Sequence, residues 1–251
     1  ILGSGASVNE LKKEEKNFIE SSMSVGINFF FLSDINPTYL AWEETQIKKI
    51  NILKLYLKIL KKKNKEKNNF KPKLLIHHGI FKEIKYFKDL NNYFDSISLY
   101  SIARIFYLNE VKLSKIYNYI FHQSVLKLLS KGMIYGIHGS VDRIMHLAIA
   151  SGYKKIVFVG VDLNNSKNFW EELKFNNNLK KELKLISPKD FNQIHKVEQD
   201  ITEKNIKKIP LSKIIRINQK YFLKKKVKFY TSSQNSKLYE FLPLFQFPKK
   251  K

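Results

Sequence analysis

The stretch GSVDRIMHLAIASGYKKIVFVGVDL, residues Gly139–Leu163, decides the fold. Ser140 can cap a helix by accepting a hydrogen bond from a first-turn amide, and Gly152 can end that helix because glycine adopts the left-handed conformation at least cost. Lys155–Val161 is a near-continuous apolar run, which is typical of a central strand in a parallel sheet, where both faces are covered. The helix is predicted to bury one face, formed by Val141, Ile144, Leu147, Ala148 and Ser151.

Strands and helices are predicted to alternate along the rest of the chain. Glu43 to about Lys62 has the apolar stripe of an amphipathic helix, and Gly79–Leu129 is interpreted as mostly helical. Further strands are predicted at Val25–Ser33, Pro37–Trp42, Leu74–His78, near Ile97–Tyr100 and at the start of Val227–Ser236. This alternation predicts an α/β fold with one doubly wound, mostly parallel sheet. Residues 1–251 are expected to form a single domain.

Asp162 lies just past the carboxyl end of the predicted central strand, where open α/β sheets bind their ligands. The segment 164–194 that follows is polar and weakly patterned, and its length predicts a lid over that crevice. Within it, Asn164 and Trp170 are candidate lid or sugar contacts, and packing of the lid is the alternative role for Trp170.

The opening residues ILGSGAS, Ile1–Ser7, are a second candidate for ligand contact. Gly3 and Gly5 would let the backbone turn sharply and approach a ligand, with amides at a helix start available to phosphate. A plain strand-to-helix turn has the same pattern. The stretch lacks the third glycine of the dinucleotide fingerprint and the Gly-Lys-Ser/Thr of a P-loop, so it supports neither an NAD enzyme nor a P-loop NTPase.

Composition narrows the class of protein. The 251 residues include no cysteine, which excludes disulfides, cysteine-ligated zinc and a cysteine nucleophile. The formal charge of +24 is compatible with an anionic partner, but nearly all of it is lysine, which an AT-rich genome would also produce. No nucleic-acid-binding motif is present. No apolar run approaches the roughly eighteen residues of a membrane span, and the missing initiator Met suggests a segment upstream.

The motifs together resemble the bacterial sialyltransferase family of the Campylobacter lipooligosaccharide type. Gly3–Ser7 stands in place of that family's Gly-Asn-Gly-Pro-Ser turn, and Asn28 in GINFFF matches an asparagine that contacts the nucleotide. Gly139 and Ser140 match a Thr-Ser pair before the central helix, and SGYKKIVFVGVDL matches the helix–strand join almost residue for residue. The end of the chain, with Asn235 and Ser236, is also similar. The family is distantly related to motility-associated flagellin glycosylation factors.

The resemblance implies a Rossmann-like fold and a metal-independent, inverting glycosyltransferase that needs no cofactor. It would move a sialic acid or related nonulosonic acid from a CMP-activated donor to a glycan such as lipooligosaccharide. His195 in NQIHKVEQD falls where the family has its catalytic histidine, and a neutral imidazole suits a general base near neutral pH. The implied donor-binding residues are Gly3, Ser4, Gly5, Ser7, Asn28, Gly139, Ser140 and Asp162.

Two departures from the family pattern keep other functions open. Ser4 stands where the family has an asparagine. The family's two active-site tyrosines would fall near Asn164 and Trp170, and neither residue is a tyrosine. A flagellin glycosylation factor, a pterin pyrophosphokinase-like enzyme and a basic binding protein for nucleic acid or membrane are the alternatives. The resemblance also implies a cytoplasmic enzyme whose lysines and basic end, Phe247–Lys251, would attract it to anionic lipid. A homo-oligomer is compatible with it.

Overall fold

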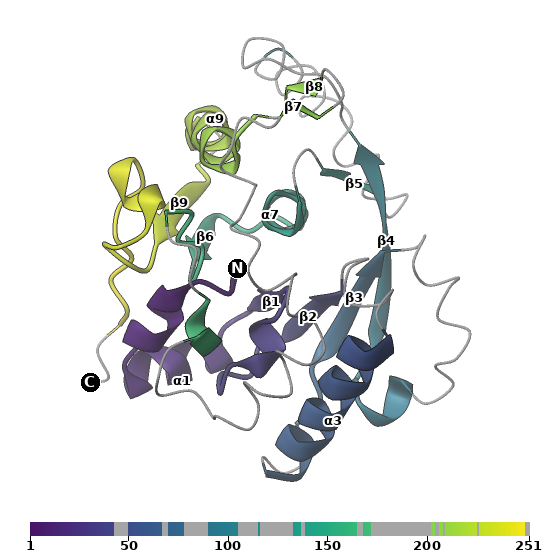
Figure 1. The fold of residues 1–251 in the computed structure, drawn as a ribbon. Helices are drawn as coiled ribbons and strands as arrows, with labels where there is room; N and C mark the ends of the chain where they lie inside the picture. Colours follow the sequence, from purple (N-terminus) through teal and green to yellow (C-terminus); the bar gives the residue numbers. More distant parts are fainter. Residues whose placement is uncertain are drawn as a thin grey trace.

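A computed structural model describes residues 1–42, 50–66, 70–77, 90–104, 115, 133–136, 139–164, 168–171, 202–203, 206–207, 209–224 and 226–248. At its centre lies the extended N-terminal segment 1–3 (Figure 1). Leu2 pairs in parallel with Gly26 on one side and with Val159 on the other. Its amide donates to the Val25 carbonyl at 2.9 Å, and the next amide, that of Gly3, donates to Val159 at 2.7 Å.

The segment 1–3 thereby joins two groups of parallel strands into one sheet. From edge to edge the order is β9 (Lys228–Thr231), β6 (Lys155–Phe158), the segment 1–3, β1 (Val25–Ile27), β2 (Tyr39–Trp42), β3 (Lys73–His77), β4 (Ile97–Arg104) and β5 (Met133–Gly136). The described residues also contain an antiparallel pair, β7 (Thr202–Glu203) with β8 (Ile206–Lys207). The predicted mostly parallel sheet is therefore confirmed.

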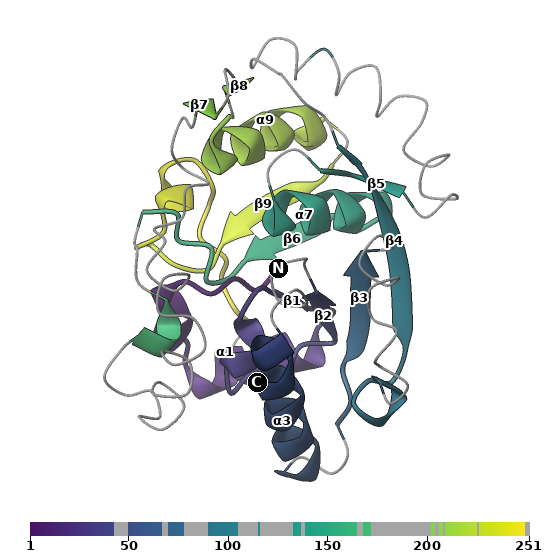
Figure 2. The ribbon, with the colours of Figure 1, turned by 45° about the vertical axis from the view of Figure 1, so that its right-hand side comes forward.

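Helices cover both faces of the sheet (Figures 1 and 2). In β3, Leu74 and Ile76 belong to one hydrophobic core and Leu75 to the other, because successive side chains of a strand point to opposite faces. Helices α1 (Lys13–Ser21) and α3 (Ile50–Glu66) pack into the first core, and α7 (Ser140–Ala150) and α9 (Leu211–Leu223) into the second. With the chain wound outward from segment 1–3 in both directions, the sheet is doubly wound.

The prediction of one strand over Val25–Ser33 is wrong in its extent. β1 ends at Ile27 because Asn28 has the left-handed backbone angle φ 54°. The chain then forms a short 3₁₀ helix, η2 (Phe30–Leu32), whose Phe30 and Phe31 rings are fully buried in the first core. The apolar residues after Asn28 are core residues, as their composition indicates, but they do not extend the sheet.

Helix α7 differs from its prediction in two respects. Gly139, with φ 140°, occupies the N-cap position, and no side chain caps the helix; the expected cap by Ser140 is wrong because its hydroxyl donates elsewhere. The buried face also differs from the predicted one. Asp142 and His146 are buried with Val141 and Ile144, whereas Leu147, Ala148 and Ser151, predicted to be buried, are partly exposed or exposed. Asn218 of α9 lies 3.2 Å from the His146 ring, so this buried side of α7 faces α9.

Other boundaries shift by a few residues. The predicted Glu43–Lys62 helix is α3, which runs to Glu66; residues 43–49 lie outside the described residues. β4 continues to Arg104, past the predicted Tyr100, and β5 was not predicted. Most of the middle interpreted as helical lies outside the described residues.

Candidate functional site

A cavity of about 180 Å³ lies at the carboxyl ends of segment 1–3, β1 and β6. This is the point where the chain changes winding direction, and ligands of open α/β sheets bind there. Every residue predicted to bind the donor nucleotide lines this cavity except Ser7, which supports it from behind. Residues more than a hundred positions apart in the chain are thereby brought together in one place.

Asp162 fixes the loop that follows the central segment. Its Oδ2 accepts a hydrogen bond from the Ser7 amide at 2.9 Å, and its Oδ1 accepts one from the Ser7 hydroxyl at 2.5 Å. Asp162 is 6 % exposed and Ser7 is 3 % exposed. Hydrogen bonds to a buried carboxylate are among the stronger ones in proteins, so this pair holds the loop after segment 1–3 against the end of β6.

The glycines of the opening stretch are explained by the approach of two backbone segments. A Cβ atom on Gly5 would lie 2.4 Å from Oδ2 of Asp162, and one on Gly3 would lie 2.4 Å from the carbonyl oxygen of Gly160. The sequence analysis expected this room to serve a ligand. In the structure the group that excludes a side chain at Gly5 is the Asp162 carboxylate.

The sheet opens between Ser4 and Asn28. The N–H and the C=O of Leu2 both form hydrogen bonds with β1. In a parallel strand, residues two apart face the same neighbouring strand, so the amide of Ser4 also faces β1. Among the described residues it has no hydrogen-bond partner, because β1 turns away at Asn28. The Ser4 N–H is therefore a donor at the wall of the cavity.

The opposite wall is the N-terminus of α7. The Ser140 hydroxyl donates to Oδ1 of Asn28 at 3.1 Å, which leaves the Asn28 amide hydrogens for other acceptors. Asn28 and Leu163, with φ 54° and 61°, both line the cavity. Such left-handed residues are uncommon outside glycine and concentrate at functional sites. The first-turn amides of α7 add partial positive charge here.

The segment 168–171 packs behind the opening loop. The Phe169 amide donates to the Ser4 carbonyl at 3.0 Å, and Asn168 bridges to Gly5. Trp170 is 4 % exposed and its ring meets the Phe29 ring edge-on at 5.4 Å. Trp170 thus has the packing role that was its alternative interpretation.

The loop after β9 ties the parts of the site together. Ser236 donates to the Val161 carbonyl at 2.8 Å, and the Lys237 amide donates to the Asp162 carbonyl at 2.8 Å. The Glu10 carboxylate, at the end of the 3₁₀ helix η1 (Ala6–Glu10), accepts hydrogen bonds from Ser233 at 2.9 Å and from Asn235 at 2.7 Å. Sequence reasoning missed Glu10, because nothing local marks it as facing a loop more than 220 residues away.

Asn164 belongs to the same loop contact, since its side-chain amide donates to the Asn235 carbonyl at 2.5 Å. The rest of the predicted lid, 165–167 and 172–194, and the predicted catalytic His195 lie outside the described residues. Within the described residues there is no cluster of three or more side chains suited to hold a metal ion. No described helix is long and apolar enough to cross a membrane.

The doubly wound parallel sheet with a cavity at its switch point defines a Rossmann-like α/β protein. The fold is similar to that of the sialyltransferase CstII from Campylobacter jejuni, solved with the substrate analogue CMP-3FNeuAc, with a TM-score of 0.51 and 16% identity over 97% of this chain and 84% of that one. A variant of CST-II solved with CMP gives 0.50 and 17% over the same shares. No family model and no curated protein matches the sequence.

Proposed function

We propose that the protein is a glycosyltransferase that moves a sialic acid or related nonulosonic acid from a CMP-activated donor to a glycan such as lipooligosaccharide. The observation that carries the proposal is the convergence of the predicted donor residues on one cavity at the switch point of the sheet. CstII, which has a similar fold, was solved with a CMP-sugar analogue.

The cavity has hydrogen-bond donors that suit the phosphate of a nucleoside monophosphate. The phosphate would lie between the Ser4 amide and the N-terminus of α7, where backbone donors and the helix dipole favour an anion. The Asn28 amide, oriented by Ser140, would donate to the donor sugar or the phosphate. Fixed donors of this kind stabilise the charge that develops on a leaving phosphate, so we propose that transfer needs no metal ion.

The acceptor hydroxyl must lose its proton as the new glycosidic bond forms. We assign this proton to the imidazole of His195, which is available as a base near neutral pH. Attack from the face opposite the leaving CMP inverts the configuration at the anomeric carbon. The CMP phosphate leaves with the bonding electron pair and is stabilised by the donors at the cavity wall.

Binding of CMP, measured by calorimetry, tests the donor site. Ser140→Ala removes the hydroxyl that orients Asn28 and should weaken CMP binding about tenfold, the value of one hydrogen bond to a well-placed partner. Ser21→Ala is the matched control, because Ser21 is an exposed serine at the end of α1. Equal CMP affinity of both variants and the wild type would contradict the assignment of this cavity.

Transfer from CMP-sialic acid to lactose in the presence of EDTA tests the reaction. Retained turnover is expected, whereas activity that requires ATP and Mg²⁺ would favour the pterin pyrophosphokinase-like alternative. His195→Ala should slow transfer by about 10²–10⁴ with unchanged CMP binding, and added imidazole should restore part of the rate. A variant with wild-type turnover would remove His195 from the mechanism.

A further inference from the structure

The backbone conformation of Leu163 is the least expected feature of the cavity at the switch point. In the described part of the chain, the residues other than glycine with a left-handed backbone are Asn28, Leu163 and Lys226. Asparagine adopts this conformation several times more often than most residues, and Lys226 lies in an exposed turn. Leucine at φ 61° is unfavourable, and glycine or asparagine would relieve the cost. Such a cost at a ligand site indicates a function for the side chain.

Hydrogen bonds on both sides of Leu163 hold it in this conformation. Before it, the Asp162 carbonyl accepts a hydrogen bond from the Lys237 amide at 2.8 Å. After it, the Asn164 side chain donates to the Asn235 carbonyl at 2.5 Å. A strained residue persists where its surroundings determine it in this way. The Leu163 side chain is half-buried and is held at the cavity wall.

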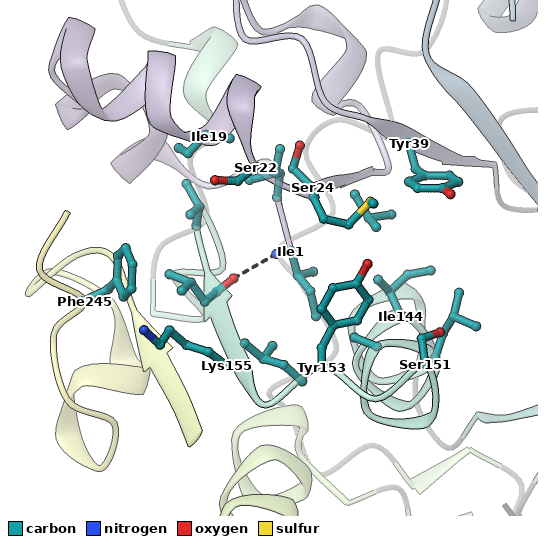
Figure 3. Close-up of a pocket in the computed structure, with 18 of the residues that line it drawn as sticks. Ile1, Ile19, Ser22, Ser24, Tyr39, Ile144, Ser151, Tyr153, Lys155 and Phe245 are labelled. Atoms are coloured by element: carbon teal, nitrogen blue, oxygen red, sulfur yellow. Dashed lines mark hydrogen bonds between the residues drawn. The ribbon is translucent and has the colours of Figure 1, made fainter. Parts of the chain in front are cut away.

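The order of the strands places Leu163 on one side of the proposed phosphate site. Segment 1–3 lies between β6 and β1, and the nitrogen of Ile1 donates to a carbonyl of β6 at 2.8 Å (Figure 3). Leu163 follows β6 and Asn28 follows β1, whereas Ser4 follows the segment between them. The carboxyl ends of parallel strands lie at one edge of a sheet. A phosphate at the Ser4 amide therefore has Leu163 on one side and Asn28 on the other.

The two sides of the cavity differ in polarity. The β6 side is lined by the apolar residues Val161, Leu163 and Leu211; Leu211 begins α9, which packs against β9, the neighbour of β6. Leu211 is 3 % exposed, so the second core fixes its position. The β1 side has the Asn28 amide and the Ser140 hydroxyl. A nucleotide sugar has a flat base at one end and a sugar with hydroxyl groups at the other, so the apolar side suits the base.

We infer that Leu163 determines the specificity for the base of the donor: with Leu211 it forms an apolar wall that accepts a one-ring pyrimidine and excludes a purine. The cavity of about 180 Å³ is smaller than the roughly 300–1,000 Å³ that is usual for small-molecule sites, so a two-ring base has to displace this wall. The inference rests on the proposed function, because it requires that the cavity binds the nucleotide of the donor. It adds the residue that selects the base.

Calorimetric titration of the whole protein with CMP and with AMP tests the inference. The wild type should bind CMP at least tenfold more tightly than AMP. Leu163→Gly removes the wall and also the unfavourable backbone conformation, so its thermal midpoint should stay within a few degrees of that of the wild type. Its CMP affinity should fall about tenfold because the apolar contact of one side chain is lost, whereas its AMP affinity should stay the same or rise. The ratio of the two affinities should therefore fall about tenfold.

Three further variants separate the role of the side chain from damage to the fold. Leu163→Met keeps an apolar side chain of similar volume and should retain the wild-type ratio. Leu163→Asn also suits a left-handed backbone but makes the wall polar, and it should lower the ratio even if Leu163→Gly does not fold. Leu223→Ala removes a leucine that is 59 % exposed at the end of α9, and it should change neither affinity.

The outcomes distinguish failure of this inference from failure of the proposed function. An unchanged affinity ratio in the folded Leu163→Gly and Leu163→Asn variants would overturn the inference, even if both affinities fell, because equal losses indicate damage to the loop. A wild type that binds AMP as tightly as CMP would also overturn it. In these cases CMP binding by the wild type leaves the proposed function standing, whereas a wild type that binds neither nucleotide contradicts both.

Discussion

The contact between Gly5 and Asp162 predicts a non-additive pair of mutations. Gly5→Ala would place a Cβ atom 2.4 Å from Oδ2 and 2.6 Å from Cγ of Asp162, and 2.9 Å from the Gly160 carbonyl oxygen. Gly5 has φ −69°, which alanine adopts without strain, so the cost is one of overpacking alone. Overpacking of a tight interior destabilises by about 1–3 kcal/mol.

Asp162→Ala should also destabilise the protein, for a different reason. It removes the acceptor of both the Ser7 amide and the Ser7 hydroxyl, and each buried donor left unsatisfied costs about 1–3 kcal/mol. Taking about 2 kcal/mol for Gly5→Ala and about 3 kcal/mol for Asp162→Ala, independent sites would lose about 5 kcal/mol together. In the double variant the new methyl group no longer meets a carboxylate. We expect a loss at least about 1 kcal/mol smaller than the sum, with part of the cost remaining from Gly160.

Urea unfolding followed by circular dichroism measures the free energy of unfolding of the four proteins. The control pairs Gly152→Ala with Asp162→Ala. Gly152 has φ 87° and no atom near its Cβ position, so the cost of Gly152→Ala is backbone strain. The free-energy losses of Gly152→Ala and Asp162→Ala should therefore be additive to within about 0.5 kcal/mol. Additivity of the Gly5 pair to the same precision would show that the carboxylate does not occupy the space beside Gly5, and would refute the account of the opening loop.

Three further changes test other parts of the structure. Asn218→Ala removes the side chain that His146 meets between α7 and α9 and should lower the free energy of unfolding by about 2 kcal/mol; unchanged thermal unfolding would contradict that contact. Glu10→Ala should speed hydrogen exchange of the amides near Ser233 while costing less than about 1 kcal/mol overall, because Glu10 is exposed; unchanged exchange there would mean that Glu10 does not hold the loop. In protein whose chain begins at Ile1, burial lowers the pKa of the α-amino group from 8.0 to about 5. The unfolded chain then binds the proton first as pH falls, so stability should decrease from pH 8 to pH 5 by up to about 4 kcal/mol; a similar decrease after acetylation of the amine would contradict this.

The sequence alone was sufficient for the features that local patterns encode. The apolar run of Lys155–Val161 identified β6, although β6 ends at Phe158 and is next to the edge strand β9. The helix before it was found by spacing and by Gly152. The strand and the helix depend on periodicity and on backbone conformation, which neighbouring residues determine. The candidate donor residues, among them Gly3, Gly5 and Asn28, came instead from the resemblance of the motifs to a known family, and their role stays a prediction.

The tertiary structure decided how these pieces act together. That Ile1–Gly3 is the central strand depends on hydrogen bonds to β1 and β6, and those partners lie more than twenty and 150 residues away. The role of Asp162 is to hold Ser7, and Ser140 orients Asn28 and does not cap its own helix. A side chain takes the partner that the packed chain brings within hydrogen-bonding distance, and sequence spacing carries no record of that distance.

The same reasoning explains the end of α7. Its pattern predicted that Leu147, Ala148 and Ser151 are buried, but Leu147 and Ala148 are partly exposed and Ser151 is exposed, because whether an apolar face is covered depends on what packs against it. In the folded protein α1, the C-terminal segment and the strand ends leave a hollow there. Apolar character is a property of the sequence, whereas burial is a property of the assembled molecule.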